Sequence, residues 1–227
     1  MLADIEWPTP PEVGQKPIVL IASDWSHEER NRMHPILPGL LVGPYIATRN
    51  VELLQRYHVT HILCIRDPLE VRILNRPVVG IENQFMDVPA NVAKENIIQH
   101  FDQATLYIEQ AISAGGHVLV CCADGIDKGP AFAAAYLMRK YALRAVDSIT
   151  FMQNRRYCSC PSARGYRIKL LEYEPICDAR RQFEGNTNVQ GGSGRRRAAE
   201  DDIGDGGEGS GAETPNRRIA APRRRIV

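Results

Sequence analysis

The sequence has almost no excess of charge of either sign and few aromatic residues. Its 28 Lys and Arg residues are balanced by 27 Asp and Glu residues, and Phe, Trp and Tyr make up 7% of the chain. A near-neutral chain offers no bulk electrostatic attraction to nucleic acid or to anionic membranes. No apolar run approaches the length of a bilayer span, and the N-terminus lacks a charged-then-apolar signal pattern. We therefore expect neither a nucleic-acid partner nor a membrane partner.

Cysteine is also sparse, and its spacing argues against disulfides and metal. The six cysteines are Cys64, Cys121, Cys122, Cys158, Cys160 and Cys177. Without a secretory pattern they are expected to be free thiols of a reducing compartment. The Cys158-Ser-Cys160 spacing is too short for ordinary metal ligands, so we expect no metal and no cofactor. The expected location is cytoplasmic and nuclear; the basic runs at 195–197 and 223–225 either act as nuclear localisation signals or merely solubilise the tail.

The chain divides by composition into one domain with two flanking segments. Its 227 residues suit a single domain plus a tail. Residues 1–24 are rich in proline and are expected to form a loosely ordered N-terminal segment. Residues 25–183 carry the domain. Residues 184–227 contain Gly, Arg and acidic residues but no aromatics, so they cannot offset their ordering entropy by burial and are expected to form a disordered charged tail.

Strands alternate with helices between these flanks. Hydrophobic periodicity predicts strands over 40–42, 60–65, 84–88 and 117–121. It predicts helices over 50–57, from 97 to 112, from 129 onward, over 146–156 and over 165–181. Gly115 and Gly116 are expected to end the long helix, and Pro175 is expected to kink or break the last one. The alternation indicates an α/β layered domain.

The segment His117–Pro130 has the form of an anion-binding loop. An apolar strand runs into Cys122, and Ala123, Asp124, Gly125, Ile126 and Asp127 separate it from Lys128. Gly129 and Pro130 then open an apolar, Ala-rich helix. A strand end, a short loop of backbone N–H groups and a helix N-terminus together favour an anion. The predicted phosphate loop therefore comprises Cys122, Ala123, Asp124, Gly125, Ile126, Asp127 and Lys128.

This loop and its surroundings resemble the dual-specificity phosphatase family. The supporting segments are Ile36-Leu-Pro-Gly-Leu-Leu-Val-Gly-Pro-Tyr45, Val59-Thr-His-Ile-Leu-Cys-Ile-Arg66, Glu95-Asn-Ile-Ile98, Phe151-Met-Gln-Asn-Arg-Arg-Tyr-Cys158 and Leu170-Leu-Glu-Tyr-Glu174. The resemblance runs from about Trp25 to Phe183 and is strongest to a pseudophosphatase of the family. It implies a protein-tyrosine-phosphatase-like α/β fold of the dual-specificity type, with a central mixed sheet flanked by helices.

The family's loop reads His-Cys-x5-Arg-Ser/Thr, and this chain departs from it around the retained cysteine. Cys121, Lys128 and Gly129 stand at the His, Arg and Ser/Thr positions. Cys122 is then a vestigial nucleophile, whose pKa without the histidine is expected to drift toward about 8.5, the value of a free thiol. Lys128 provides a point charge where arginine would provide a planar fork for two phosphoryl oxygens. The related pseudophosphatase does the reverse, lacking the cysteine and keeping the arginine.

The general acid is missing as well. Measured back from Glu95-Asn-Ile-Ile98, the family's aspartate position holds Asn91. An amide cannot give a proton, and loss of the acid alone costs roughly 10²–10⁴-fold. Asp87 is the only nearby substitute, although it comes too early in the chain. Arg155, Arg156 and Arg164 could flank a phosphopeptide, but such a run more often forms a solvated face.

Two carboxylates within the loop suggest that it is filled from inside. Asp124 and Asp127 are tethered beside the backbone N–H groups, and Lys128 is expected to pair with one of them. Phosphate and phosphotyrosine peptides are then expected to bind only weakly.

The expected function is that of a catalytically inactive phosphatase-like protein. The resemblance implies a scaffold or competitor that binds signalling proteins, such as phosphorylated MAP kinases or an F-box subunit of a ubiquitin ligase. A monomer is expected. One alternative is a weak cysteine-dependent protein tyrosine or dual-specificity phosphatase that uses Cys122. Another keeps Cys122 only as a redox-responsive thiol beside Cys121.

Overall fold

A five-stranded mixed sheet forms the centre of the domain. The computed structural model describes residues 5–20 and 25–190. The strand order is β1-β2-β5-β3-β4, with β1 at His34–Leu37, β2 at Leu40–Pro44, β3 at His61–Arg66, β4 at Glu82–Asp87 and β5 at Val118–Cys122. Only β1 is antiparallel to its neighbour, β2. The predicted mixed sheet is confirmed, and β1 is a strand that the periodicity did not predict.

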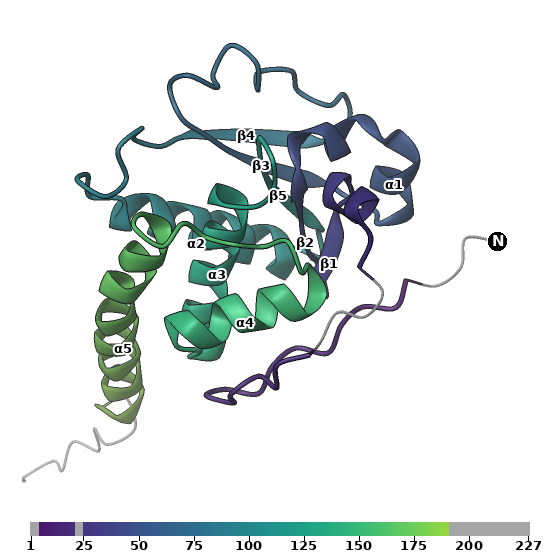
Figure 1. Cartoon of the computed structure of the whole chain (residues 1–227). Coiled ribbons are helices and arrows are strands. Elements are labelled where there is room, and N and C mark those ends of the chain that lie inside the picture. The colour runs from purple at the N-terminus through teal and green to yellow at the C-terminus, as the bar shows by residue number, and fades with distance from the viewer. Residues whose placement is uncertain (1–4, 21–24, 191–227) are drawn as a thin grey trace, which may run out of the picture. The chain divides into compact units, whose positions relative to one another are not determined.

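Helices cover both faces of this sheet. They are α1 (Val51–Arg56), α2 (Ile98–Ser113), α3 (Lys128–Tyr141), α4 (Ala145–Arg155) and α5 (Tyr166–Gln190), with short 3₁₀ helices η1 (His27–Asn31) and η2 (Tyr45–Arg49). The helices α2, α3 and α4 lie on one side of the sheet and α1 lies on the other (Figure 1). None of the described helices is both long and apolar enough to cross a membrane.

The central strand β5 separates two hydrophobic cores. Val118, Val120 and Cys122 join the core beneath α2 and α3, whereas Leu119 and Cys121 join the core on the α1 side. Successive side chains of a strand point to opposite faces, so a strand covered on both faces needs a continuous apolar run. Cys121 and Cys122 therefore belong to different cores, although they are neighbours in the chain.

The helix α2 lies against the sheet along the face that its periodicity predicts. Phe101, Ala104, Ile108 and Ala111 are all buried. The chain turns away just after the helix at Gly115, whose φ of 79° is unfavourable for a residue with a side chain. The predicted glycine stop is therefore confirmed.

The last helix runs past Pro175 without the predicted break. The structure has one α-helix from Tyr166 to Gln190 with the proline inside it, and it appears as one helix in Figure 1. Tyr173 and Cys177 are buried on either side of Pro175, and this packing offsets the roughly 3 kcal/mol cost of an internal proline. The helix α5 continues to Gln190, past the predicted domain boundary at residue 184. Residues 191–227, expected to be disordered, lie outside the described residues.

The N-terminal segment, expected to be loosely ordered, contacts the domain at several of its described residues. Residues 5–20 contain no helix or strand, but the Gly14 N–H donates to the Tyr141 carbonyl at 3.0 Å. The Asn154 side chain donates to the Ile18 carbonyl and accepts from the Leu20 N–H. The centroids of the Trp7 and His117 rings also lie 5.0 Å apart. The described residues of this segment therefore belong to the same compact unit as the domain.

Candidate functional site

The predicted anion loop lies between the end of β5 and the start of α3. Gly125 is at its centre, with a φ of 66°. A Cβ atom at this position would lie 2.4 Å from the Pro44 nitrogen and 2.5 Å from the Gly43 carbonyl carbon. Only glycine fits here, and the loop therefore packs directly on the backbone at the end of β2.

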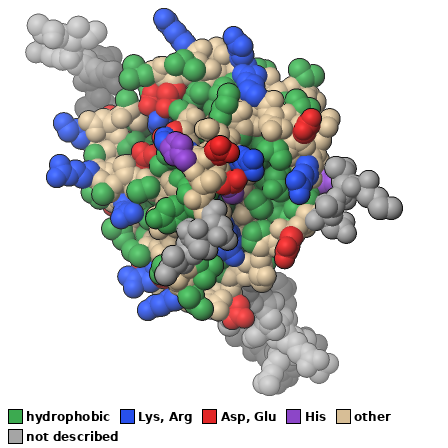
Figure 2. All heavy atoms as spheres, turned by 45° about the vertical axis from the view of Figure 1, so that its right-hand side comes forward, with side chains coloured by type: hydrophobic (Ala, Val, Ile, Leu, Met, Phe, Trp, Pro, Cys, Tyr) green, Lys and Arg blue, Asp and Glu red, His purple; other side chains and the backbone are tan. Residues whose placement is uncertain are grey.

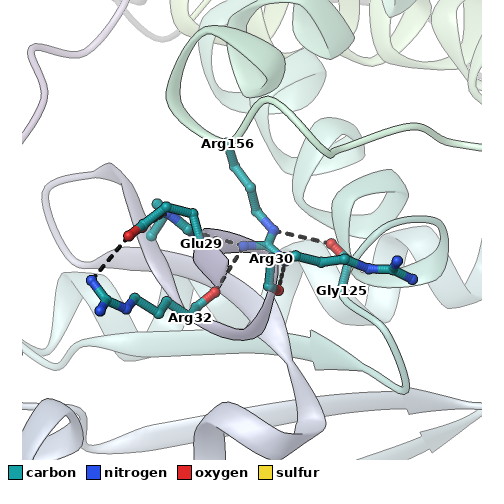
Figure 3. Close-up of polar contacts among 6 residues, drawn as sticks. Glu29, Arg30, Arg32, Gly125 and Arg156 are labelled. Atoms are coloured by element: carbon teal, nitrogen blue, oxygen red, sulfur yellow. Dashed lines mark hydrogen bonds and ion pairs between the residues drawn. The ribbon is translucent and has the colours of Figure 1, made fainter. Parts of the chain in front are cut away.

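Arg156 holds the loop through its guanidinium, which lies between Gly125 and the chain around Arg30 and Arg32 (Figure 3). Its side chain is fully buried. The guanidinium donates to the carbonyl of Gly125 at 3.1 Å, and to the carbonyls of Arg32 at 2.8 Å and Arg30 at 2.9 Å. The expectation of a solvated arginine face is therefore wrong for Arg156. Its planar fork of donors joins the loop to the chain around η1, a use that a lysine could not match.

His34 completes this contact on the η1 side. Its Nδ1 atom lies 2.8 Å from Nη1 of Arg156, and its Nε2 atom lies 3.1 Å from a carboxylate oxygen of Glu29. Burial and the neighbouring Arg156 charge lower the pKa of His34, although Glu29 acts in the opposite direction. A neutral imidazole can accept the arginine N–H at Nδ1 and donate from Nε2 to Glu29.

Cys122 is a buried, protonated thiol at the base of the loop. Burial raises the pKa of Cys122 to about 12, against the opposing hydrogen bonds of the Gly129 and Gly125 backbone. At pH 7 the thiolate is then on the order of one part in 10⁵, and the thiolate is the nucleophilic form. The sulfur lies 3.5 Å from Oδ1 of Asp124, which accepts the thiol proton. The pKa of Cys122 is therefore higher than the value of about 8.5 that loss of the histidine alone would give.

Cys121 is not a redox partner beside this thiol. Its side chain lies on the opposite face of the sheet, where it is in register with Cys64 on β3. Its pKa is raised by the Cys64 thiol and by burial. The hypothesis of a redox pair formed by Cys121 and Cys122 is therefore not supported by the geometry.

Lys128 pairs with two carboxylates from outside the loop. Its ammonium lies 2.8 Å from Glu70 Oε1 and 3.2 Å from Asp67 Oδ2, in the segment after β3. Burial opposes the charge of Lys128, but these carboxylates raise its pKa overall. The predicted pairing of Lys128 with Asp124 or Asp127 is therefore wrong.

The two carboxylates are fixed by their own turn. Asp67 Oδ1 accepts from the backbone N–H groups of Leu69 and Glu70, at 2.9 and 3.2 Å. Glu70 Oε2 accepts in return from the Asp67 N–H at 2.9 Å. Such reciprocal side-chain caps hold a turn in one conformation. Both acids therefore reach Lys128 without rearrangement.

The loop's own carboxylates point in different directions. Asp124 Oδ1 accepts from the Ile126 N–H at 2.8 Å and also meets Cys122, so an internal carboxylate does occupy the loop. Asp127 Oδ1 instead accepts from the Ser162 N–H at 2.8 Å. Burial raises the pKa of Asp127, although the Ser162 contacts oppose it. The prediction of internal occupation is confirmed for Asp124 and wrong for Asp127.

Asn91 lies at the edge of the same site. With Pro89, Ala90, Val92 and Ala93 it lines a cleft of about 340 Å³, whose other walls are Asp67, Asp127, Lys128, Ser162, Arg164, Gly165 and Tyr166. The alternative acid Asp87 is bound to Arg66, with Oδ1 2.5 Å from Nε. Of the two positions, the structure thus brings Asn91 and not Asp87 to the cleft.

Sequence reasoning missed Asp67, Glu70 and Tyr166, and it placed Arg156 on a solvated face. The Asp-x-x-Glu spacing at 67–70 could have indicated a self-capping turn, but not its contact with Lys128, which is distant in the chain. No local pattern distinguishes the buried Arg156 from the half-buried Arg155 beside it. Acidic, basic and apolar side chains are interspersed on the face that Figure 2 shows. Among the described residues, no group of His, Cys, Asp and Glu side chains is suited to hold a metal ion.

Comparisons with known proteins agree with this geometry. Residues 42–176 match the model of the dual specificity phosphatase catalytic domain. The human serine/threonine/tyrosine-interacting protein (STYX) is 33% identical over 174 residues, which cover 76% of this chain and 75% of that protein. Its mouse counterpart is 34% identical over 157 residues, covering 68% and 70% of the two chains.

Solved structures show the same relationship. The crystal structure of human STYX superposes with a TM-score of 0.60 at 34% identity, covering 64% of this chain and 97% of that chain. The crystal structure of DUSP15 gives a TM-score of 0.60 at 27% identity, covering 68% and 96%. The matched domain, the mixed sheet and the strand–loop–helix site together show that the chain belongs to the dual specificity phosphatase family.

Proposed function

We propose that the protein is a catalytically inactive member of this family that binds signalling proteins. The observation that carries the proposal is the pairing of Lys128 with Glu70 and Asp67. The only cation at the family's arginine position is already neutralised by fixed carboxylates. A phosphoryl dianion would have to displace them or meet their negative charge.

The other steps of cysteine-phosphatase chemistry are impaired at the same site. Attack on phosphorus needs a thiolate, but Cys122 is held as a thiol by burial. Departure of the product oxygen needs a proton donor, and Asn91 carries none to give. The charge that develops on the phosphoryl oxygens must be stabilised by positioned hydrogen-bond donors. One such donor of the loop, the Ile126 N–H, already donates to the carboxylate of Asp124. Losses in one catalytic unit are not additive, so any one of them would reduce turnover greatly.

The relationship to STYX supports a binding role. We infer a scaffold or competitor that occupies surfaces otherwise used by active phosphatases or by substrates. Its partners are signalling proteins, with phosphorylated kinases of the MAP kinase class and an F-box subunit of a ubiquitin ligase as the candidates to test first. It would act as a monomer in the cytoplasm and nucleus. Pull-down with the full chain, followed by titration of each captured protein, tests this role.

A weak phosphatase is the second candidate, favoured by one observation. The backbone groups of Gly129 and Gly125 still hydrogen-bond toward the Cys122 sulfur and lower its pKa, against the larger effect of burial. An aryl phosphate assay on the full chain separates the two functions. We expect turnover no greater than that of Cys122→Ser, and turnover that this substitution abolishes would refute inactivity.

A further inference from the structure

We propose that His34 is a pH-sensitive contact of the loop: its neutral imidazole helps to join the loop to the chain around η1, and its protonation breaks this link. The inference goes beyond the proposed function, because it concerns how the loop is held and not what the loop binds. The donor and acceptor geometry around Arg156 carries it.

Arg156 is a buried cation whose contacts in the described part of the chain are all with neutral acceptors. Its side chain is fully buried, and its guanidinium donates to three backbone carbonyls, those of Gly125, Arg32 and Arg30. The fourth partner is Nδ1 of His34, 2.8 Å from Nη1. An arginine side chain has donors only and does not lose its charge in proteins. Every group that contacts it must therefore accept, Nδ1 of His34 included.

The two ring nitrogens of His34 consequently have fixed roles at neutral pH. Nδ1 accepts from Arg156, so the ring proton lies on Nε2, which donates to the carboxylate of Glu29 at 3.1 Å. A second proton could bind only at Nδ1. It would set two donors and two positive charges against each other across 2.8 Å. Protonation of His34 and its contact with Arg156 are therefore mutually exclusive.

The charges around His34 oppose each other. Glu29 on η1 favours the imidazolium, although Arg32 is paired with the other oxygen of the same carboxylate at 2.9 Å. Arg156 at the end of α4 favours the neutral ring, the neighbouring strand β2 has no titratable side chain, and the Trp25 ring lies 5.4 Å from the imidazole. Burial and Arg156 together outweigh Glu29 and lower the pKa of His34. The titratable groups that face Arg156 are Arg30, Cys122, Asp124 and Cys158.

Mild acid is therefore expected to weaken the link between the loop and η1. The His34 side chain is 14% exposed, so a proton can reach it without unfolding of the chain. Because its pKa is lower in the folded chain than the value of roughly 6.5 in the unfolded chain, its contribution to stability is fully present above the unfolded pKa. This contribution is lost as pH falls through the folded pKa.

The test is a pH titration of the full chain by NMR, from about pH 7.5 to about pH 5, the range in which histidine changes charge. Carbonyl carbon shifts of Gly125, Arg30 and Arg32 report whether these groups still accept from Arg156. We expect them to change together with the His34 ring signals, with one shared midpoint below roughly pH 6.5. Thermal melts at the two ends of the range should give the lower melting temperature under acid.

Three substitutions separate this contact from general acid effects. His34→Asn keeps an acceptor near the place of Nδ1 but cannot gain a proton in this range, so the three carbonyl shifts should stop responding to pH. Glu29→Gln keeps an acceptor for Nε2 but removes its charge, so the midpoint should move to still lower pH. His27→Gln, at an exposed histidine of η1, is the matched control and should leave the midpoint unchanged. Melts at neutral pH confirm folding of each variant.

Two outcomes would overturn the inference. One is a set of carbonyl shifts that stay constant while the His34 ring titrates. The other is an acid response in His34→Asn with the midpoint of the unmodified chain. If His34→Asn does not fold, Glu29→Gln decides, since an unmoved midpoint in that variant also refutes the inference. Turnover of an aryl phosphate, which tests the proposed function, has no bearing on any of these results.

Discussion

The buried Arg156 offers the sharpest test of how the loop is held. Replacing it with lysine keeps the charge but removes the planar fork that reaches the carbonyls of Gly125, Arg32 and Arg30. A lysine ammonium is a point charge on a flexible stem and cannot reach these acceptors in the same geometry. At least one buried carbonyl would therefore lose its donor.

The size of the effect follows from the number of bonds lost. A hydrogen bond to a charged group contributes about 1.5–3 kcal/mol, and an unsatisfied buried acceptor costs about 1–3 kcal/mol. Allowing for partial compensation by the lysine, we expect Arg156→Lys to lower the free energy of unfolding by about 3–5 kcal/mol. For a domain of this size, that corresponds to a fall of roughly 6–20 °C in melting temperature.

Urea denaturation of the full chain measures the change in the free energy of unfolding. The slope of this free energy against urea concentration is compared between variants. The matched control is Arg164→Lys, since Arg164 is exposed and should change stability by less than about 0.5 kcal/mol. A loss below about 1 kcal/mol for Arg156→Lys would refute the bracing role. Equal losses of stability in Arg156→Lys and Arg164→Lys would refute it too.

Two further predictions concern the groups around Cys122. Replacing Asp67 and Glu70 with Asn and Gln should free the Lys128 charge and raise inorganic phosphate affinity by about 10-fold or more, measured by calorimetry; unchanged affinity would show that these acids do not block the anion. Because burial raises the Cys122 pKa to about 12, its thiol should resist iodoacetamide between pH 7 and 9 while the exposed Cys160 reacts, as peptide mass spectrometry would show. The same pKa difference links stability to pH. The unfolded chain ionises this thiol at roughly pH 8.5, whereas the folded chain keeps it neutral to about pH 12. Its contribution to the free energy of unfolding is therefore fully present below the unfolded pKa and is lost as pH rises toward about 12. Faster alkylation of Cys122 than of Cys160 would contradict the burial argument.

Much of the fold could be predicted because its signals are local. The apolar run into Cys122 and the periodicity of α2 each follow from a few consecutive residues. The strand β1 was missed because its four residues include a proline and pair through an irregular register. The break at Pro175 was wrongly expected because the packing of Tyr173 and Cys177, which keeps the helix intact, is tertiary.

The site was less predictable than the fold. The loop boundaries and the position of Asn91 follow from chain order, and the structure brings both to one cleft. Glu70, one of the two partners of Lys128, lies 58 residues away in the chain, and no local rule connects the two. The burial of Arg156 depends likewise on carbonyls near the start of the domain, which only the folded chain brings together.

The packing of Gly125 against the end of β2 has a consequence for molecular recognition. The loop is held on one side by the strand backbone and on another by a guanidinium, so its conformation does not depend on a bound anion. A partner that contacts this surface meets a preorganised one and loses little conformational entropy of the loop on association. Shape and reactivity are therefore separable here: these contacts keep the contour of the loop whether or not its side chains support phosphoryl transfer.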